Sequence, residues 1–334
     1  MRGESGEATR WLSTEPQLPP IRAQKEHALK VSEDIYSVET VLYEQVLTRS
    51  HVVHGERVAL IDTGMNSTYG QFVEVLDALG LKINDVALIL HTHGHVDHIG
   101  SDLQVSRASK CLIGAHRLAA PWIEDHELQF KEVMGLYPAI LPASTETYEW
   151  YMGIMDGNTR VDLKFDEGLT IDLGEGVTLR VYHLPGHTEG DVGFYLSAGR
   201  TMIIGDATPF LEDLSVGLYY DPAVMLNTLN RLATLRKELP FDRLLSGHYG
   251  PMYGEQIGEY LGECSDYVSA YEGRVLGRVK AGREGATLGE VAQATAEELG
   301  KSYDAVALVT SHGHLRDLQS RGLLREAGGR WTIA

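Results

Sequence analysis

The sequence of 334 residues has few cysteines, no long apolar run and a shortage of positive charge. Its two cysteines, Cys111 and Cys264, lie far apart and in no metal-ligand spacing, so we expect neither a disulfide framework nor a cysteine metal site. No stretch approaches the roughly 18 apolar residues that cross a membrane. The first twenty residues lack the apolar core of a signal peptide. These absences predict a soluble protein of the cytoplasm.

The shortage of positive charge restricts the partners. Lys and Arg number 29 against 47 Asp and Glu, a formal net charge of -18. This charge repels polyanions, so we expect neither a nucleic acid nor an anionic membrane as the main partner. The hydrophobic content of 43% is that of an ordinary globular protein. The length allows one large domain and one smaller unit, and leaves a homo-oligomer open.

The sequence divides into regions that differ in composition and in hydrophobic pattern. Residues 1–20 are polar and form a predicted flexible arm. Between 21 and 265, strand-like runs such as "RVALIDTG" and "VALIL" alternate with helical patterns, which indicates an α/β layered fold. An aromatic-rich stretch at about 120–160 interrupts this alternation and is predicted to be a helical insertion.

Residues 266–334 form a separate predicted module. Thr287 and Glu290 make a capping-box pattern at the start of a helix, a second helix follows, and Gly328-Gly329 mark a hairpin turn. Helix, helix and hairpin are typical of a winged helix. Its basic and acidic residues balance, so a role in packing or beside an active site is favoured over DNA binding.

The densest chemical signal is "LHTHGHVDHIG" at residues 90–100. On a helix His93 and His95 would point about 200° apart, but at a strand end or in a loop both can reach one ion. Asp97 and His98 lie just beyond and could serve a second ion. Imidazole and carboxylate are suitable ligands for zinc, manganese or ferrous iron. This stretch alone therefore offers the beginnings of two metal sites.

Four further polar residues follow strand-like runs, each near a glycine. They are Asp62 after "ALI", His187 after "HLPG", Asp206 after "MIIG" and His248 after "LLSG". Packing alone does not explain this repeated placement. The remaining histidines have simpler interpretations. His91 belongs to the strand that leads into the motif, and His183 is a packed strand residue. His51, His54, His116 and His126 are surface or core polar groups, and His312 and His314 are surface or capping groups.

The motif "THGHVDH", with His187, Asp206 and His248, resembles the metallo-β-lactamase superfamily over roughly residues 30–260, with a ligand set similar to that of glyoxalase II. The resemblance implies an αββα sandwich with a metal site at one edge. It implies that His93, His95 and His187 hold one divalent ion, that Asp97, His98 and His248 hold a second, and that Asp206 bridges them. Asp62 would orient the ligands. We expect zinc, with iron or manganese as alternatives.

The implied activity is hydrolysis of a small-molecule acyl substrate by a hydroxide that bridges two metal ions. Asp97 and Asp206 would be the catalytic carboxylates. Pro209 stands where quorum-signal lactonases usually have Tyr, and no basic residue lies near His248 as in glutathione thioesterases. An ester or thioester hydrolase is therefore the main prediction. A lactonase and an iron-dependent redox enzyme or oxygenase of the same fold are the alternatives.

The aromatic insertion suggests a substrate pocket. Tyr148, Trp150 and Tyr151 lie between the second and third groups of predicted ligands, and we expect them to line or cover the entrance to the metal site. The alternative is that these aromatics form the core of an ordinary helical hairpin.

Overall fold

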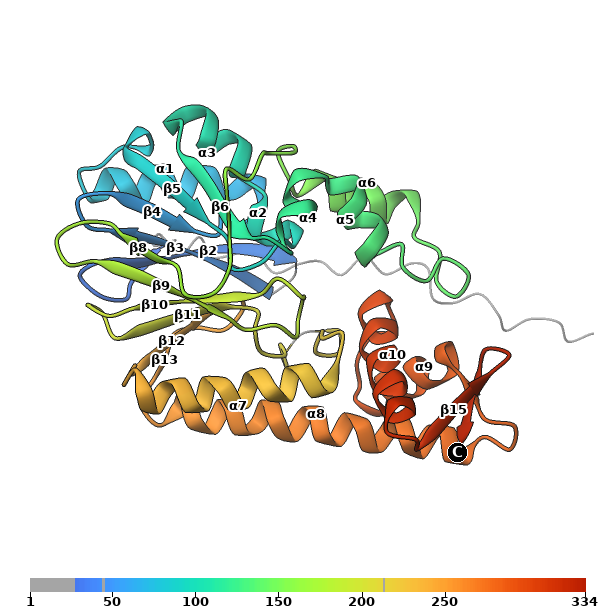
Figure 1. The fold of residues 1–334 in the computed structure, drawn as a ribbon. Helices are drawn as coiled ribbons and strands as arrows, with labels where there is room; N and C mark the ends of the chain where they lie inside the picture. Colours follow the sequence, from blue (N-terminus) through green and yellow to red (C-terminus); the bar gives the residue numbers. More distant parts are fainter. Residues whose placement is uncertain (1–27, 44–45, 213) are drawn as a thin grey trace, which may run out of the picture.

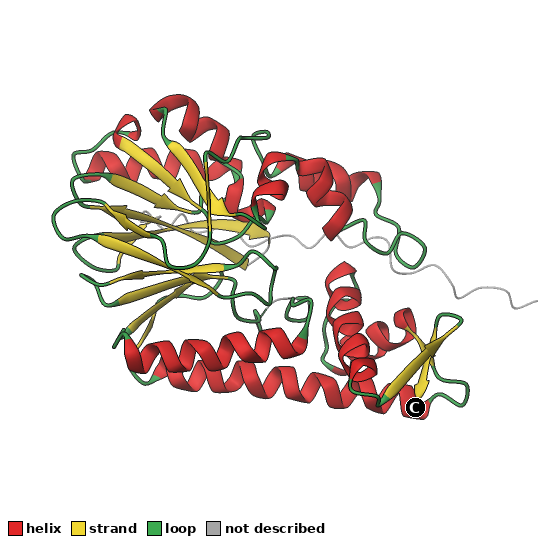
Figure 2. Cartoon of the chain, in the orientation of Figure 1, coloured by secondary structure: helices red, strands yellow, loops and turns green. Residues whose placement is uncertain are grey.

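The computed structural model describes residues 28–43, 46–212 and 214–334, so the predicted arm at residues 1–20 lies outside the described part. Two β-sheets face each other, with helices on both outer faces (Figure 1). Figure 2 shows the strands as the inner layers of this sandwich and the helices as the outer ones. This is the predicted αββα order of layers.

The first sheet contains seven strands in chain order, antiparallel at first and parallel from β4 to β7. They are β1 (Ala28–Lys30), β2 (Ile35–Tyr43), β3 (Val46–His54), β4 (Val58–Ile61), β5 (Val86–Leu90), β6 (Leu112–His116) and β7 (Leu163–Phe165).

The second sheet has the order β13-β12-β11-β10-β9-β8, and only its β11–β12 pair is parallel. Its strands are β8 (Thr170–Asp172), β9 (Thr178–His183), β10 (Val192–Leu196), β11 (Thr201–Gly205), β12 (Arg243–Ser246) and β13 (Met252–Tyr253).

Alternating burial explains why the sheets stack. In β4, Val58 and Leu60 belong to the apolar cluster under the outer helices, whereas Ala59 and Ile61 belong to the cluster between the sheets. In β11, Ile203 lies between the sheets, and its neighbours face the other helical layer. Each large side chain buried in this way contributes about 1.5–3 kcal/mol. Both faces of each sheet are therefore covered.

The outer helices follow the predicted periodicity. Phe72, Val75 and Leu76 of α1 are buried against the first sheet, and Gly80 adopts a φ of 74° just after the helix, as is usual for a glycine in this position. The helices on this side are η1 (Asn66–Thr68), α1 (Tyr69–Ala78), η2 (Ile83–Asp85), α2 (Val96–Ile99) and α3 (Asp102–Ser109). The second sheet is covered by α7 (Pro222–Glu238) and α8 (Gln256–Ala281).

The insertion is helical, as predicted. It contains α4 (Ala120–Glu124), α5 (His126–Val133) and α6 (Thr145–Gly153). Asp125 caps α5 by accepting a hydrogen bond from the backbone of Leu128. The phenyl ring of Phe130 packs edge-on against the ring of Tyr151. This contact joins α5 to α6.

The C-terminal residues form the predicted order of helix, helix and hairpin, with one additional short strand. The elements are β14 (Ala286–Thr287), α9 (Leu288–Glu298), α10 (Ala305–Ser320), β15 (Leu324–Ala327) and β16 (Arg330–Ile333). The side chain of Glu290 accepts a hydrogen bond from the backbone N–H of Thr287 at 2.8 Å, and the Thr287 hydroxyl accepts one in return, so the predicted capping box is present.

One continuous helix joins this module to the sandwich. The 26-residue helix α8 runs through the predicted boundary at 265/266. Its second half supplies Tyr271, Val275 and Val279 to the core of the module. The two units therefore share α8 instead of being joined by a linker.

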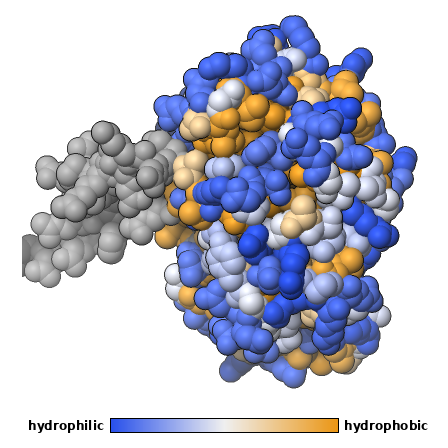
Figure 3. Space-filling model, turned by 90° about the vertical axis from the view of Figure 1, so that its left-hand side faces the viewer, coloured by the Kyte–Doolittle hydropathy of each residue, from blue (hydrophilic) through white to orange (hydrophobic). Residues whose placement is uncertain are grey.

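Among the described residues, no helix is both long and apolar enough to cross a membrane. The face of the molecule opposite the C-terminal module mixes hydrophilic residues with separate hydrophobic patches (Figure 3). Such scattered apolar residues are usual on protein surfaces.

Candidate metal centre

The carboxyl ends of several strands meet at one edge of the sandwich. Asp62 directly follows β4, and the histidine motif follows β5, which runs parallel to β4. Asp206 directly follows β11, and His248 lies just beyond β12, again a parallel pair. His187 lies on the loop after β9. The carboxyl ends of strands from both sheets therefore place the predicted residues close together.

Seven of these residues form three overlapping groups in which the ligand atoms all lie within 4.8 Å of one another. One group is His93, His95 and His187, and another is Asp97, His98 and His248. These are the two ligand sets that the sequence predicts. The third group contains His93, His98 and Asp206 and so includes members of both sets.

A single oxygen of Asp206 faces both sets. Its Oδ2 atom lies 3.0 Å from Nε2 of His248 and 3.5 Å from Nε2 of His98. The same oxygen is 3.6 Å from Nε2 of His187 and 3.8 Å from Nε2 of His93. This position is the one that a carboxylate needs if it bridges two cations.

Hydrogen bonds turn three rings so that Nε2 faces this centre. Nδ1 of His98 contacts Asp62 Oδ2 at 2.9 Å, Nδ1 of His187 contacts the carbonyl of Leu218 at 3.2 Å, and Nδ1 of His248 contacts that of Leu47 at 2.9 Å. Because Nδ1–H donates a hydrogen bond to each of these oxygens, Nε2 is the atom left to bind a metal ion. His95 instead presents Nδ1, which lies 2.8 Å from Nε2 of His187.

Unpaired buried atoms support a metal site. Nε2 of His93, Nε2 of His98 and Oδ1 of Asp206 are buried without a hydrogen-bond partner in the described part of the chain. An unpaired buried polar group costs about 1–3 kcal/mol, and coordination to a cation would offset that cost. Imidazoles and carboxylates gathered around one point fit zinc, and iron or manganese as well. The donor set therefore fits the predicted pair of divalent ions.

The protonation states differ across the centre. Burial lowers the pKa of His93 and of His95 well below the usual value, so both rings are neutral and ready to coordinate. Burial would also lower the pKa of His248, but Asp206 outweighs it and raises that pKa to about 9. The pKa of His98 is raised in the same way. A metal ion must displace these protons, so its binding releases them.

Asp62 orients the surrounding groups. Its Oδ2 accepts hydrogen bonds from His98 Nδ1 and from the Thr92 hydroxyl at 2.7 Å, and its Oδ1 accepts one from the Thr92 N–H at 2.8 Å. Burial would raise the pKa of Asp62, but His98 and His91 hold it well below its usual range. The residue has a φ of 60°, a strained conformation that Asp tolerates better than most residues.

Two glycines beside the candidate ligands permit close approach. A Cβ atom on Gly247 would lie 2.1 Å from Oδ1 of Asp206 and 2.6 Å from Cε1 of His98. Gly205 has a φ of 51°, and a Cβ there would lie 2.2 Å from the Thr92 hydroxyl. Any larger residue would displace a group of the centre, which explains these glycines at the strand ends.

The other histidines have structural partners. His91 is buried and lies outside the three groups; its Nε2 is 2.9 Å from Asp102 Oδ2. His183 contacts the carbonyl of Glu189 at 2.8 Å. The prediction of a surface or capping role is wrong for His314, which is fully buried and lies 2.8 Å from the Tyr219 hydroxyl. Its face of α10 is turned inward.

Some residues that contact the centre could not be identified from sequence motifs. The Thr48 hydroxyl donates a hydrogen bond to Asp97 Oδ2 at 2.9 Å, and the Arg49 side chain donates one to the carbonyl of His248. Both residues lie on β3, far along the chain from their partners. A threonine and an arginine in a strand carry no local signal for such a role.

In the described part of the chain, two cavities open onto the centre. The narrow one has a volume of about 130 Å³ and contacts Asp97, Asp206 and His248. The larger one, about 590 Å³, reaches from His95 and His187 toward the insertion and α10. Residues of α10 line both cavities, so the C-terminal module forms part of the wall.

The insertion contributes to the larger cavity through Trp122. Its indole ring stacks on the imidazole of His95 at a centroid distance of 5.4 Å, and its Nε1 donates a hydrogen bond to Glu132 at 2.7 Å. The three predicted pocket aromatics line neither cavity. Tyr151 is buried and donates to Gln129, Tyr148 donates to Glu127, and Trp150 is 45% exposed.

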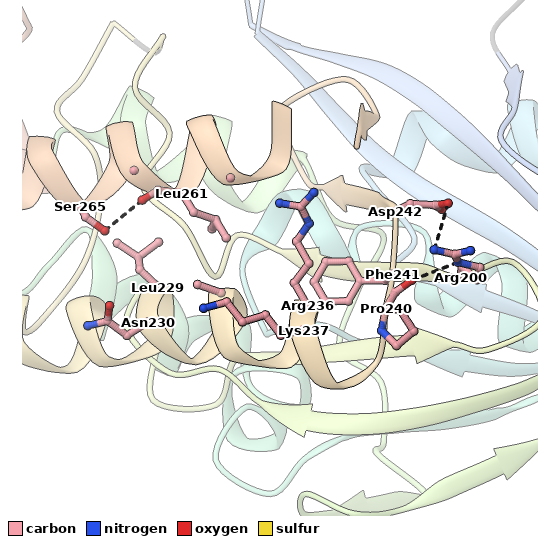
Figure 4. Close-up of a pocket in the computed structure, with 13 residues that line it drawn as sticks. Arg200, Leu229, Asn230, Arg236, Lys237, Pro240, Phe241, Asp242, Leu261 and Ser265 are labelled. Carbon is pink, nitrogen blue, oxygen red and sulfur yellow. Dashed lines mark hydrogen bonds and ion pairs between the residues drawn. The ribbon is translucent and has the colours of Figure 1, made fainter. Parts of the chain in front are cut away.

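A further cavity of about 610 Å³ lies between α7 and α8, away from the metal centre (Figure 4). Its floor is apolar, and Arg200 pairs with Asp242 at 3.5 Å on its rim. None of the seven candidate ligands lines it. The size of a cavity therefore does not identify the site in this protein.

Comparisons with known proteins agree with this geometry. An uncharacterised protein of Mycobacterium leprae is 30% identical over 47% of this chain and 64% of its own length. A probable metallo-hydrolase of Methanocaldococcus jannaschii is 26% identical over 60% of this chain and 87% of its own. A hydroxyacylglutathione hydrolase of Methylococcus capsulatus is 25% identical over 51% of this chain and 50% of its own.

The structural similarity to a known protein extends beyond the metal domain. The crystal structure of a metallo-beta-lactamase family protein from Thermus thermophilus superposes with a TM-score of 0.75 at 21% identity. It covers 91% of this chain and 100% of the other. The family model described as the metallo-beta-lactamase superfamily matches residues 46–248, which include all seven candidate ligands. This chain therefore belongs to the metallo-beta-lactamase superfamily.

Proposed function

We propose that this protein is a metal-dependent hydrolase that uses two divalent ions, zinc in the first instance, to cleave an ester or thioester bond of a small acyl substrate. The observation that carries the proposal is the position of Asp206 Oδ2, within 3.0–3.8 Å of four imidazole nitrogens from both ligand sets. When bound, two such ions supply a hydroxide nucleophile at neutral pH and polarise the carbonyl.

The residues of the chain would position the reactants. Asp97 is held by the Thr48 hydroxyl at 2.9 Å and belongs to the set with His98 and His248. A carboxylate fixed in this way can accept a proton from the attacking water and keep it oriented toward the carbonyl. Leu218 and Val306 line the narrow cavity and make that side of it apolar.

No cysteine of the chain is suited to nucleophilic catalysis. Cys111 and Cys264 are both buried, and neither lines a cavity at the centre. Burial raises the pKa of the Cys264 thiol to about 12, so the reactive thiolate is scarce at neutral pH. A nucleophile supplied by the metal centre is consistent with this arrangement.

Two observations bear on the substrate, one on the bond that is cleaved and one on the carrier of the acyl group. The similarity to a hydroxyacylglutathione hydrolase points to thioester cleavage as a reaction class. Among the described residues, the cavities at the centre contain no lysine or arginine that could bind the carboxylates of glutathione. We therefore propose a thioester or ester with a different carrier.

Metal analysis and a substrate panel test the proposal together. Protein purified without added metal, then loaded with zinc, iron or manganese, should bind two ions per chain. It should hydrolyse members of a panel of esters, thioesters and lactones. A single ion per chain would contradict the dinuclear centre. Oxygen consumption with the iron form, without hydrolysis by any form, would contradict the reaction class.

A further inference from the structure

We infer that the 590 Å³ cavity beside the metal centre binds an uncharged, apolar part of the substrate and excludes anionic groups. This inference names a substrate class and rests on the proposed function. An aliphatic or aromatic acyl group of medium size has the required chemistry. The volume lies within the range of about 300–1,000 Å³ that is usual for small-molecule sites.

The walls of this cavity are mainly apolar. They combine parts of the chain that lie far apart in sequence: the insertion with the two residues before it, the loops after β9 and β11, and α10. Among the apolar side chains are Pro121, Trp122, Leu128, Leu136, Leu218 and Val309. A substrate group placed among them would bury apolar area on several sides.

The charges at the walls have one sign. Apart from the two candidate ligands His95 and His187, the charged groups that line the cavity are Glu132 and Glu189. Neither this cavity nor the narrow one has a lysine or arginine among its described lining residues. Tyr220 adds no negative charge, because burial first and then Glu189 raise its pKa to about 12. An anionic group at this wall, away from the metal ions of the centre, would therefore meet carboxylates and no lysine or arginine among the described lining residues.

The aromatic wall is fixed close to the reacting position. Trp122 stacks on the ring of His95 at an interplanar angle of 16°, and its Nε1 is held by Glu132. Because this hydrogen bond occupies the indole N–H, the wall offers its apolar face. A group that extends from a carbonyl at the centre would lie along this indole.

The C-terminal module contributes the opposite side. Val306 lines the narrow cavity and Val309 lines the larger one, and residues three apart lie on the same face of α10. This face would contact the substrate on the side away from the insertion. The module therefore takes part in selecting the acyl group.

Binding of two matched fluorescent probes tests the inference without any turnover. N-phenyl-1-naphthylamine is neutral, and 8-anilinonaphthalene-1-sulfonate has the same rings and an added sulfonate. We expect the metal-loaded full-length protein to bind the neutral probe at least tenfold more tightly. Equal or tighter binding of the sulfonate would overturn the inference.

Two variants with the same change of charge locate the effect. Glu189→Lys should reduce the ratio of the two affinities at least threefold, because it places a cation at the wall. Glu149→Lys is the matched control, since this exposed residue of α6 lines neither cavity. An equal change in both variants would show that the probes bind elsewhere and would overturn the inference.

A kinetic comparison separates the substrate class from the reaction. Hexanoyl, adipoyl and 6-aminohexanoyl thioesters of one thiol share a six-carbon acyl chain and end in a neutral, an anionic and a cationic group, respectively. The neutral substrate should have a kcat/KM at least tenfold higher than the anionic one, and Leu136→Lys at a half-exposed wall position should reduce this preference. Preference for either charged chain would overturn the inference. If the probe results hold but no ester or thioester is cleaved, the ligand class stands and the proposed reaction fails.

Discussion

The carboxylate of Asp62 accepts a hydrogen bond from Nδ1 of His98 at 2.9 Å, and Nε2 of the same ring lies 3.5 Å from Asp206 Oδ2. Asp62 at the end of β4 thus orients the His98 ring of α2 toward Asp206 at the end of β11, and so connects the two sheets. Because Thr92 donates to both oxygens of Asp62, the carboxylate itself has little freedom. These hydrogen bonds within the protein therefore fix the orientation of the His98 ring.

Asp62→Asn tests this orientation. An amide can place its NH₂ opposite the His98 N–H, which removes the acceptor that fixes the ring. We expect a loss of metal affinity of about 10–100-fold, the usual effect of removing such a partner, with a smaller change in folding. Competition with a chelator measures the affinity. Unchanged metal affinity would show that Asp62 does not act through His98.

Asp206→Asn tests the bridging carboxylate. The substitution keeps the shape of the side chain but removes the negative charge that faces four imidazoles, so binding of both ions should weaken. We expect most of the activity to be lost, with far-ultraviolet circular dichroism unchanged. Metal content by mass spectrometry of the intact protein and turnover are the measurements. Near-normal values of both would exclude a bridging role.

The glycine positions show what the sequence could reveal about this centre. Gly205 and Gly247 stand next to candidate ligands in the sequence, and the structure shows that a Cβ there would collide with Thr92 and Asp206. The local sequence pattern thus predicts which loops lie together at the metal centre. Thr48 and Trp122 could not be found in this way, because their contacts join segments distant in sequence. An aromatic residue in an insertion does not disclose which side of its helix faces the site.

His314 provides a test by pH. Burial lowers its pKa to about 3, below the value of 6.5 for an exposed histidine. Between these values the unfolded chain binds the extra proton, so the free energy of unfolding falls as pH decreases below about 6.5. His314→Gln should remove up to about 1.4 kcal/mol per pH unit from this slope. Urea unfolding of metal-free protein between about pH 4 and 7 measures it; an unchanged slope would contradict a neutral buried ring.

Two basic residues of the C-terminal module contact other groups of the protein. Lys301 donates to the carbonyl of Leu211 at 3.0 Å, and Arg321 pairs with Asp317 at 2.9 Å. With a net charge of -18 on the chain, we expect no tight binding to duplex DNA. Fluorescence anisotropy with labelled DNA at about 50 mM salt checks this. Submicromolar, salt-sensitive binding would overturn the assignment of the module to substrate selection.

Two tryptophans of the insertion form a natural pair for the final prediction. Trp122 stacks on His95 at the cavity wall, whereas Trp150 of α6 is 45% exposed and lines neither cavity. Burying an aromatic wall against a substrate contributes roughly 1.5–3 kcal/mol. At about 1.4 kcal/mol for each factor of ten, Trp122→Ala should lower kcat/KM for an apolar acyl substrate about 10–150-fold and change the preference among acyl groups. Trp150→Ala should leave both unchanged. If Trp150→Ala alters the preference and Trp122→Ala does not, the substrate enters on the α6 side, where the aromatic pattern of the sequence had placed it.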